Sequence, residues 1–303
     1  MNIKEKIKAY IDLTRAHFIP VWPLLFCSGL LLAFQNYNYF SWSLLLRAII
    51  IGTFGFEAGM VLNDIVDRNI DKLDTDDENL TKYWRPFNQR PIPSGRVSVK
   101  EAYIIFGIFV AISALFIGTL PFPHNMYVYL IMIYGYSMEI FYQVKKRDQK
   151  YPIAQLLGRT DLTFFPIAGY LCFGNIDITV LFLGFFMYRW EIAHLGVNDI
   201  VDVKNDHAKG LKTVTELYGL KGNIIWINVF TGIHILTAFI FLIFELGIIA
   251  FYGFLIAFLL LLIANILLIL NKTALGGLKI LPMYHLSLLI YMLSIILDTT
   301  ILL

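Results

Sequence analysis

Residues 63–71 read Asn-Asp-Ile-Val-Asp-Arg-Asn-Ile-Asp and follow a hydrophobic run at about 43–62 that is long enough to span a bilayer. If the helix of that run continues, Asn63, Asp67 and Asp71 are spaced i, i+4 and i+8 and lie on one face. Carboxylates stacked so closely repel each other, and a divalent cation offsets that repulsion. Mg²⁺ fits because it takes oxygen ligands, usually one or two carboxylates together with substrate phosphates. For a single stretch of this kind, a solvated acidic helix end is the alternative.

A second stretch repeats the pattern. Residues 198–206 read Asn-Asp-Ile-Val-Asp-Val-Lys-Asn-Asp and also follow a hydrophobic run. Both stretches fit N-D-x-x-D-x-x-x-D, and the acidic positions of the second copy are Asp199, Asp202 and Asp206. Two matching nine-residue patterns that leave membrane segments on the same side indicate a two-sided clamp for a metal-bound diphosphate.

The composition places the chain among polytopic membrane proteins. Of 303 residues, 58% are hydrophobic and 15% are charged, and the mean hydropathy is +0.69. Soluble domains carry about 25% charged residues, so a large soluble helical enzyme is excluded. Cys27 and Cys172 lie far apart in hydrophobic runs, which predicts neither a disulfide framework nor a zinc site. The charged N-terminal residues are not followed by a short apolar core with a cleavage site, so no removable signal peptide is expected.

Nine hydrophobic runs of spanning length predict an all-α fold with nine transmembrane helices. They lie at about 18–34, 43–62, 102–120, 126–143, 153–173, 177–197, 223–244, 248–270 and 281–302. The fifth run is flanked or interrupted by Pro152 and Pro166 and contains Arg159 and Asp161. No low-complexity tract or flexible linker separates a soluble part, so residues 1–303 are predicted to form a single transmembrane domain.

The basic residues predict the orientation. Of the 24 Lys and Arg residues, 22 fall in the N-terminal segment and in alternate loops, or at the edge of the run beside such a loop, whereas the opposite loops contain none. By the positive-inside rule the N-terminus is cytoplasmic, and nine crossings put the C-terminus outside. Both acidic motifs then lie in cytoplasmic Asp-rich loops, at about 63–100 and 198–222. The section 74–79 of the longer loop is interpreted either as a mobile lid or as a solvated excursion.

Basic residues downstream of the motifs are candidates for binding phosphate. Residues 90–96 read Arg-Pro-Ile-Pro-Ser-Gly-Arg, in which the prolines and the glycine fix the backbone. Arg90 and Arg96 can pair with phosphate oxygens through their planar guanidinium groups. Lys212 follows the second motif and has the same use. Ordinary cytoplasmic anchoring of the loops is the alternative for all of these side chains.

The end of the run at 126–143 adds an aromatic candidate. Tyr142 and Lys146 are i, i+4 partners on one helical face. Lys146 can reach a diphosphate, and the ring of Tyr142 can face an allylic cation because an aromatic face attracts positive charge. The alternative for Tyr142 is a residue of the interfacial aromatic belt.

The two acidic motifs, the segment 90–95, Lys212-Thr213 and the nine helices together resemble the UbiA superfamily of intramembrane prenyltransferases, over essentially the whole chain. The resemblance implies an all-helical fold around a central cavity and a lateral opening for an isoprenoid tail. It also implies Mg²⁺ as cofactor and a prenyl diphosphate held between the two motifs.

The resemblance implies roles for particular residues. The implied metal-binding and catalytic residues are Asn63, Asp67, Asp71, Asp202 and Asp206, with Tyr142 as a further catalytic residue. The implied substrate-binding residues are Arg15, Asp64, Arg68, Arg90, Lys146, Asp199 and Lys212. The segment between Asp71 and Arg90 is longer than the family pattern, so the arginine that meets the diphosphate stays open among Arg68, Arg85 and Arg90.

Charged residues inside the membrane runs are functional candidates. Glu57 or Glu139 is interpreted as a contact for the head group of the acceptor, and a structural pair between Glu57 and Arg189 is the alternative. Glu191 lies in the same run as Arg189. His194, one turn before the second motif, is a candidate for facing the cavity.

The resulting hypothesis is transfer of an isoprenyl group from a prenyl diphosphate, with geranylgeranyl diphosphate as one candidate, to a lipophilic aromatic or lipid-hydroxyl acceptor. Mg²⁺-assisted ionisation gives an allylic cation, the acceptor attacks it, and a carboxylate takes up the proton. The expected partners are membrane lipids, and no nucleic acid is expected. One alternative is a CDP-alcohol-type lipid phosphotransferase, but the Asp-Gly and Ala-Arg pairs of its motif are missing from the sequence. The other is a cation transporter, whose ionisable residues would lie near the bilayer midplane.

Overall fold

The computed structural model describes residues 2–75, 79–87 and 90–302, and within these ranges it contains helices and turns but no strands. The predicted all-α fold is confirmed. The long helices are α2 (Val21–Asn36), α3 (Trp42–Asp67), α5 (Val99–Gly118), α6 (His124–Lys145), α7 (Thr160–Leu171), α8 (Ile178–Val201), α10 (Val214–Glu245), α11 (Ile248–Leu270) and α12 (Ala274–Leu302). The short ones are α1 (Ile3–Leu13), η1 (Ala16–Phe18), η2 (Ile70–Leu73), α4 (Asn79–Trp84), the π-helix η3 (Ala154–Gly158) and α9 (Val203–Ala208).

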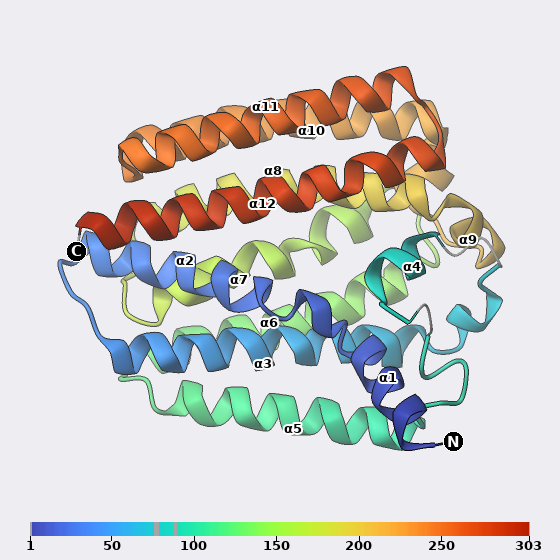
Figure 1. The fold of residues 1–303 in the computed structure, drawn as a ribbon, viewed down its shortest axis with the longest axis horizontal. Helices are drawn as coiled ribbons and strands as arrows, with labels where there is room; N and C mark the ends of the chain where they lie inside the picture. Colours follow the sequence, from blue (N-terminus) through green and yellow to red (C-terminus); the bar gives the residue numbers. More distant parts are fainter. Residues whose placement is uncertain (1, 76–78, 88–89, 303) are drawn as a thin grey trace.

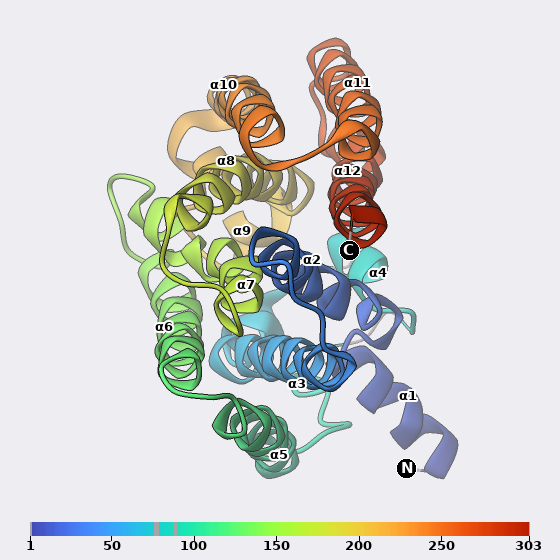
Figure 2. The ribbon, with the colours of Figure 1, turned by 90° about the vertical axis from the view of Figure 1, so that its left-hand side faces the viewer.

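The long helices form one bundle. Figure 1 shows them running side by side along a common direction, with α1, α4 and α9 at one end. The N-terminus lies at that end and the C-terminus at the opposite end. Viewed from the end that holds the C-terminus, α2 and α7 lie in the middle, and α5 and α11 lie at opposite edges (Figure 2). Helix α2 packs against α3, α7 and α12, so it links the two sides of the bundle.

Helix α11 illustrates why these sequences form a membrane bundle. Its buried apolar residues follow a heptad-like spacing and face the neighbouring helices; they are Ala250, Phe254, Ala257, Leu261, Ala264 and Leu268. Its exposed residues are equally apolar and include Leu255, Leu259, Leu262 and Ile266. A surface this apolar cannot be left in water, whereas small residues such as alanine on the inner face let membrane helices approach closely. The outer face of α11 is therefore a lipid-facing surface.

Seven helices of the described chain are long and apolar enough to cross a membrane: α2 with the turn before it, α3, α5, α8, α10, α11 and α12. Together they identify an integral membrane protein. The predicted count of nine is not confirmed, because α6 and α7 fall outside this group. Helix α7 has only 12 residues and contains Pro166, and Arg159 separates it from η3. Both α6 and α7 nevertheless lie inside the bundle, packed against each other and against α3 and α2 respectively.

Two glycines bring α2 and α7 into contact at the centre of the bundle. A methyl group at Gly29 of α2 would collide with the backbone carbonyl of Pro166, and one at Gly169 of α7 would collide with the backbone carbonyl of Phe26. Only residues without a side chain allow this approach, which small residues make possible between membrane helices generally. The contact holds α7, and with it Arg159 and Asp161 just before and at its start, against the middle of the molecule.

The acidic motifs end two helices rather than extend them. Helix α3 stops at Asp67, and Asp71 lies in the separate turn η2, so the predicted continuous helix through residue 71 is wrong. Helix α8 stops at Val201, and Asp206 lies on α9. Of the loop section 74–79, residues 76–78 lie outside the described residues. Asp74 itself pairs with Arg90 and Lys209, so this position is not a solvated excursion.

Candidate active site

A cavity of about 560 Å³ opens between the helix ends that carry the two motifs. It is lined by residues of the long helices α2, α3, α5, α6, α7, α8 and α12, of the short helices η1 and α4, and of the loops that follow α3 and α8. Its polar part contains the motif residues, whereas its wall farther along the bundle is apolar and includes Phe26, Ile117, Val128 and Leu288. One cavity therefore combines a charged end with a long apolar interior.

Ten of the predicted site residues line this cavity: Arg15, Asn63, Asp67, Asp71, Arg90, Tyr142, Lys146, Asp199, Asp202 and Asp206. The structure does not bring Asp64, Arg68 or Lys212 to the wall of the cavity. The guanidinium of Arg68 donates to the carbonyl of Ile65 at 2.6 Å, at the end of its own helix. The side chain of Lys212 is exposed, although its backbone N–H donates to the carbonyl of Lys146 at 2.7 Å.

The carboxylates of the first motif are paired with basic side chains. Asp67 accepts from Lys146 at 2.8 Å and from Arg147 at 2.9 Å. Asp71 accepts from Arg90 at 2.7 Å and from Lys209 at 3.0 Å. Burial disfavours the charged carboxylate, but the two cations outweigh burial and lower the pKa of Asp71 below its ordinary value. The charges of Asp67 and Asp71 are therefore compensated by basic side chains.

The carboxylates of the second motif have no such compensation. Asp199 accepts from the backbone N–H of Val214 at 3.0 Å, and Asp202 accepts from the amide of Asn205 at 2.8 Å. Within the described ranges, no basic side chain forms an ion pair with Asp202 or Asp206. Burial, followed by the charges of the neighbouring carboxylates, raises the pKa of Asp206 well above its ordinary value, and burial raises that of Asp202. A cation bound here would replace the missing partner.

Asp64 does not line the cavity, but it contacts two side chains that do. It is buried and accepts from Arg15 at 3.0 Å and from Arg85 at 2.7 and 2.9 Å. Arg15 and Arg85 line the cavity, so Asp64 holds two of its basic side chains in place. Of the three arginines left open by the sequence, Arg85 and Arg90 are thus cavity residues and Arg68 is not.

Tyr142 is buried inside the cavity wall rather than placed at a membrane interface. Its exposure is 5%, and a methyl group at Gly158 would collide with it. The Nζ atom of Lys146 lies 5.0 Å from the ring centroid, and the guanidinium carbon of Arg159 lies 4.0 Å from it. These contacts show that the ring of Tyr142 interacts with positive charge, as an aromatic face can do.

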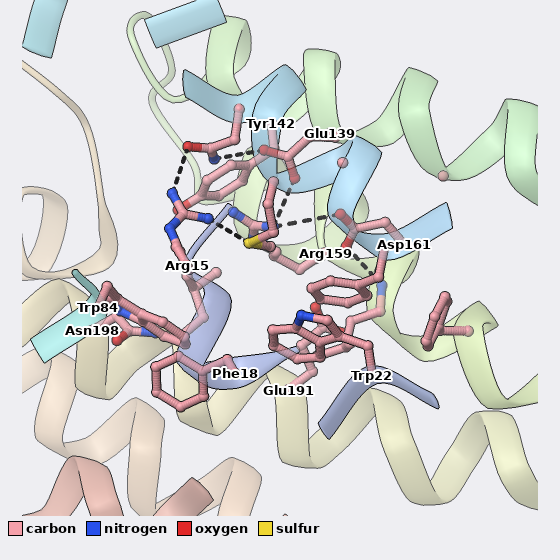
Figure 3. Close-up of a pocket in the computed structure, with 18 of the residues that line it drawn as sticks. Arg15, Phe18, Trp22, Trp84, Glu139, Tyr142, Arg159, Asp161, Glu191 and Asn198 are labelled. Atoms are coloured by element: carbon pink, nitrogen blue, oxygen red, sulfur yellow. Dashed lines mark hydrogen bonds and ion pairs between the residues drawn. The ribbon is translucent and has the colours of Figure 1, made fainter. Parts of the chain in front are cut away.

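A second cluster of charged side chains lines the cavity near Tyr142 (Figure 3). It consists of Glu139, Arg159, Asp161 and Glu191. Arg159 donates to Glu139 at 2.9 Å and lies 3.4 Å from Asp161. Glu191 is buried on α8 and accepts from the hydroxyl of Thr163 at 3.0 Å. Each of these charged residues can be recognised from the sequence, because it lies within a hydrophobic run, but the sequence does not predict that they come together at the cavity.

The predicted alternative pair between Glu57 and Arg189 does not form. Glu57 accepts instead from the indole N–H of Trp22 at 2.9 Å. The guanidinium of Arg189 lies over the rings of Tyr188 and Phe185. Arg189 thus interacts with aromatic side chains of its own helix.

His194 does line the cavity and lies 2.8 Å from His285, whose other ring nitrogen lies 2.6 Å from the hydroxyl of Tyr83. His285 belongs to an aromatic wall that the sequence reasoning missed, together with Phe18 and Trp84. Phe18, Trp84 and His285 come from η1, α4 and α12, so no local pattern in the sequence predicts their contact.

The described residues contain no cluster of three or more His, Cys, Asp or Glu side chains that would hold a metal ion by itself. The oxygen donors of the two motifs nevertheless suit Mg²⁺, because that ion usually takes only one or two carboxylates and completes its shell with waters and substrate phosphates. The donor chemistry therefore fits a metal that arrives with a diphosphate.

The family model for the UbiA prenyltransferase family matches residues 21–288. The chain is 30% identical over 268 residues to a 4-hydroxybenzoate octaprenyltransferase from Shewanella loihica, covering 84% of this chain and 86% of that protein. It is 30% identical over 189 residues to a digeranylgeranylglyceryl phosphate synthase from Methanothermobacter thermautotrophicus, covering 60% of this chain and 58% of that protein.

The fold matches the solved structure of a UbiA homologue from Archaeoglobus fulgidus bound to GPP and Mg²⁺. The TM-score is 0.67 at 16% sequence identity, with 95% of this chain and 99% of that chain covered. At this identity the match supports the fold.

Proposed function

This chain belongs to the UbiA prenyltransferase family, and from that premise we propose that it transfers an isoprenyl group from a prenyl diphosphate to a lipophilic acceptor inside the cavity described above. The observation that carries the proposal is the shape and polarity of this one cavity. Two acidic motifs that are more than a hundred residues apart in the sequence line its polar end, and its interior is apolar. A prenyl diphosphate has the same division into a charged head and an apolar tail.

The residues proposed to hold the metal are Asn63, Asp67, Asp71, Asp202 and Asp206. All five line the cavity and offer oxygen donors. When bound there, Mg²⁺ would neutralise the diphosphate and so make it a better leaving group. The Archaeoglobus fulgidus homologue was solved with GPP and Mg²⁺ bound, which supports the choice of this ion.

Basic residues of the cavity are proposed to bind the diphosphate oxygens. Lys146, Arg90 and Lys209 now pair with carboxylates of the first motif or with Asp74. These carboxylates would serve as metal ligands, and the basic side chains would then be available to phosphate oxygens. Arg90 is the proposed diphosphate arginine, because its partner Asp71 is a proposed metal ligand that lines the cavity, whereas the partner of Arg85, Asp64, does not line the cavity.

The proposed reaction breaks one bond of the prenyl diphosphate and forms one bond to the acceptor. The bond between the allylic carbon and the diphosphate oxygen breaks, and the diphosphate leaves with both electrons. Tyr142 stabilises the allylic cation with its ring face, and the buried position of this ring keeps water away. The acceptor forms the new bond to the allylic carbon, and a cavity carboxylate takes the proton that the acceptor releases.

The acceptor is proposed to be an aromatic ring or a lipid hydroxyl. One relative named above is a 4-hydroxybenzoate octaprenyltransferase, and the other is a digeranylgeranylglyceryl phosphate synthase. Geranylgeranyl diphosphate is a candidate donor, supported by the likeness to the digeranylgeranylglyceryl phosphate synthase. No contact in the described residues favours the lipid phosphotransferase or the cation transporter that the sequence left open.

The polar end of the cavity is proposed to face the cytoplasm. The loops at that end carry the basic residues, and lysine and arginine are enriched in cytoplasmic loops of membrane proteins. The N-terminus would then be cytoplasmic and the C-terminus outside.

The decisive experiment is product analysis. Purified protein in lipid nanodiscs is incubated with Mg²⁺, with geranyl, farnesyl or geranylgeranyl diphosphate, and with a panel of phenolic and glyceryl phosphate acceptors. Mass spectrometry should detect a prenylated acceptor that does not form with the Asp67→Asn variant. Lack of a prenylated product for every donor and acceptor pair, from protein that melts cooperatively, would contradict the proposal.

A further inference from the structure

Glu139 lies on α6 and is the point where several polar side chains of the cavity meet. Its exposure is 4%, and it lines the cavity. Its Oε1 atom accepts from the amide nitrogen of Asn63 at 2.7 Å and from that of Gln143 at 2.5 Å. Its Oε2 atom accepts from Arg159 at 2.9 Å (Figure 3). A carboxylate has about four acceptor positions, so three of them are taken by protein groups and little capacity is left for an acceptor head group.

The contact with Asn63 has a direction. An ionised carboxylate only accepts hydrogen bonds, so Asn63 must present its NH₂ group to Glu139. The carbonyl oxygen of the same amide then points to the other side, where it lies 3.5 Å from the guanidinium of Arg15. If the amide were turned over, Asn63 would offer hydrogens to a metal ion instead of an oxygen. Glu139 therefore determines whether the oxygen or the NH₂ group of Asn63 is available to a metal ion in the cavity.

The contact with Gln143 extends the same logic by one turn of the helix. Gln143 also presents its NH₂ group to Glu139, which leaves its oxygen to accept from the ammonium of Lys146. Lys146 in turn donates to Asp67 at 2.8 Å. One carboxylate thus sets the polarity of a chain of hydrogen bonds that ends on two residues of the first motif.

We propose that Glu139 is a positioning residue that fixes the amides of Asn63 and Gln143 in one orientation, so that Asn63 offers its oxygen to the metal ion that binds the diphosphate. The inference rests on the proposed function, because it assumes that the first motif holds a metal ion. Glu139 touches neither substrate nor metal in this scheme and acts only through its neighbours. Residues that orient metal ligands in this way typically change metal affinity by about 10- to 100-fold when they are replaced.

The first test replaces Glu139 by a side chain of nearly the same size. In Glu139→Gln, one arm of the side chain carries hydrogens and must face Asn63, Gln143 or Arg159, all of which are donors. We expect the Kd for Mg²⁺ to rise by about 10- to 100-fold. The measurement is isothermal titration calorimetry of the full-length protein in detergent, with geranyl S-thiolodiphosphate as a slowly reacting probe.

The matched control is another buried carboxylate that lies outside the cavity. Asp298 on α12 is 2% exposed and accepts from the backbone N–H groups of Gly247, Ile249 and Ala250. Asp298→Asn removes a buried charge without touching the cavity, so its Kd for Mg²⁺ should stay at the wild-type value even where its melting temperature falls. A rise in Kd equal to that of Glu139→Gln would assign the effect to general loosening and overturn the inference.

The second test exchanges the hydrogen-bond donor and acceptor between residues 63 and 139. Asn63→Asp alone places two carboxylates at hydrogen-bonding distance and should weaken Mg²⁺ binding. The double variant Asn63→Asp with Glu139→Gln restores one donor and one acceptor, keeps the net charge and still offers oxygen to the metal. Its Kd should return to within a few-fold of the wild-type value. If Glu139 served only as a partner for Arg159, the double variant would bind as poorly as the product of the two single losses predicts.

The outcomes separate the two proposals. Wild-type protein that shows no Mg²⁺-dependent binding of the probe overturns the proposed function and this inference with it. Wild-type binding together with an unchanged Kd in Glu139→Gln, or with multiplicative losses in the double variant, overturns only the role of Glu139.

Discussion

The carboxylate of Asp67, at the end of α3, lies 2.8 Å from the ammonium of Lys146, just after the end of α6. Both side chains are buried, at 5% and 8% exposure. A buried carboxylate without a counter-charge is costly, so the ion pairs with Lys146 and Arg147 stabilise the buried carboxylate of Asp67 before any ligand binds. In the proposed function the same two groups separate, Asp67 toward the metal and Lys146 toward a phosphate oxygen.

Turnover should depend on a divalent cation. The second motif gathers carboxylates that lack an ion-pair partner among the described side chains, so a bound cation would supply the positive charge that holds a diphosphate beside them. Product formation in excess EDTA should fall to the background of boiled protein and return when Mg²⁺ is restored. Undiminished turnover in the chelator would remove the metal from the mechanism.

The two motifs should act as one unit. Asp67→Asn and Asp202→Asn should each lower the single-turnover rate by several orders of magnitude, and the double variant should be little worse than the worse single one. Groups that act together are non-additive in this way. The measurement is a single-turnover rate for all four proteins, with melting temperatures as the control for folding. Fully multiplicative losses would mean that the motifs do separate tasks.

Arg90 and Arg68 should differ in their effect on the prenyl diphosphate. Arg90 lines the cavity and pairs with Asp71, whereas Arg68 donates to a carbonyl of its own helix. Arg90→Ala should raise KM for the prenyl diphosphate by about 10-fold or more, since one charge-assisted hydrogen bond is worth about 1.5–3 kcal/mol. Arg68→Ala should change KM by much less. Equal effects in the two variants would contradict the assignment of Arg90.

Gly169 should be needed for stability because of the contact between α2 and α7. In Gly169→Ala the new methyl group meets the backbone carbonyl of Phe26, which cannot move away as a side chain can. The expected loss is about 1–3 kcal/mol, seen as a lower melting temperature in detergent. The matched control is Gly232→Ala on α10, where a methyl group meets nothing within 4 Å. That variant should melt at or above the wild-type temperature, because alanine favours the helix by about 1 kcal/mol.

Labelling should place the polar end of the cavity in the cytoplasm. Asp148, after α6, and Ile176, between α7 and α8, are exposed residues in loops that follow successive helices. A cysteine at Asp148 should react with an impermeant maleimide only in inverted vesicles, and one at Ile176 only in intact cells. The native Cys27 and Cys172 are buried and should give little background. Reaction of both new cysteines from the same side would contradict the orientation.

The sequence alone determined the fold class, the family and the chemistry of the polar end of the cavity. These follow from local properties: the length of apolar runs, the i, i+4 spacing of Asn63 and Asp67, and the repeat of the motif at 198–206. Lys146 and Tyr142 were also predicted from their spacing on one helix, and both line the cavity.

Only the tertiary structure decided where the motif helices end, which basic residues reach the cavity, and what surrounds Tyr142. Lys209 pairs with Asp71 across 138 positions of sequence, and Arg159 approaches Glu139 from a helix that is interrupted before residue 160. Arg68 and Lys212 stay outside the cavity, although Arg68 lies within the first motif and Lys212 follows the second. These relationships depend on how α2 and α7 pack through Gly29 and Gly169 and on where each helix stops, and contacts between distant helices leave no periodic signal in the sequence.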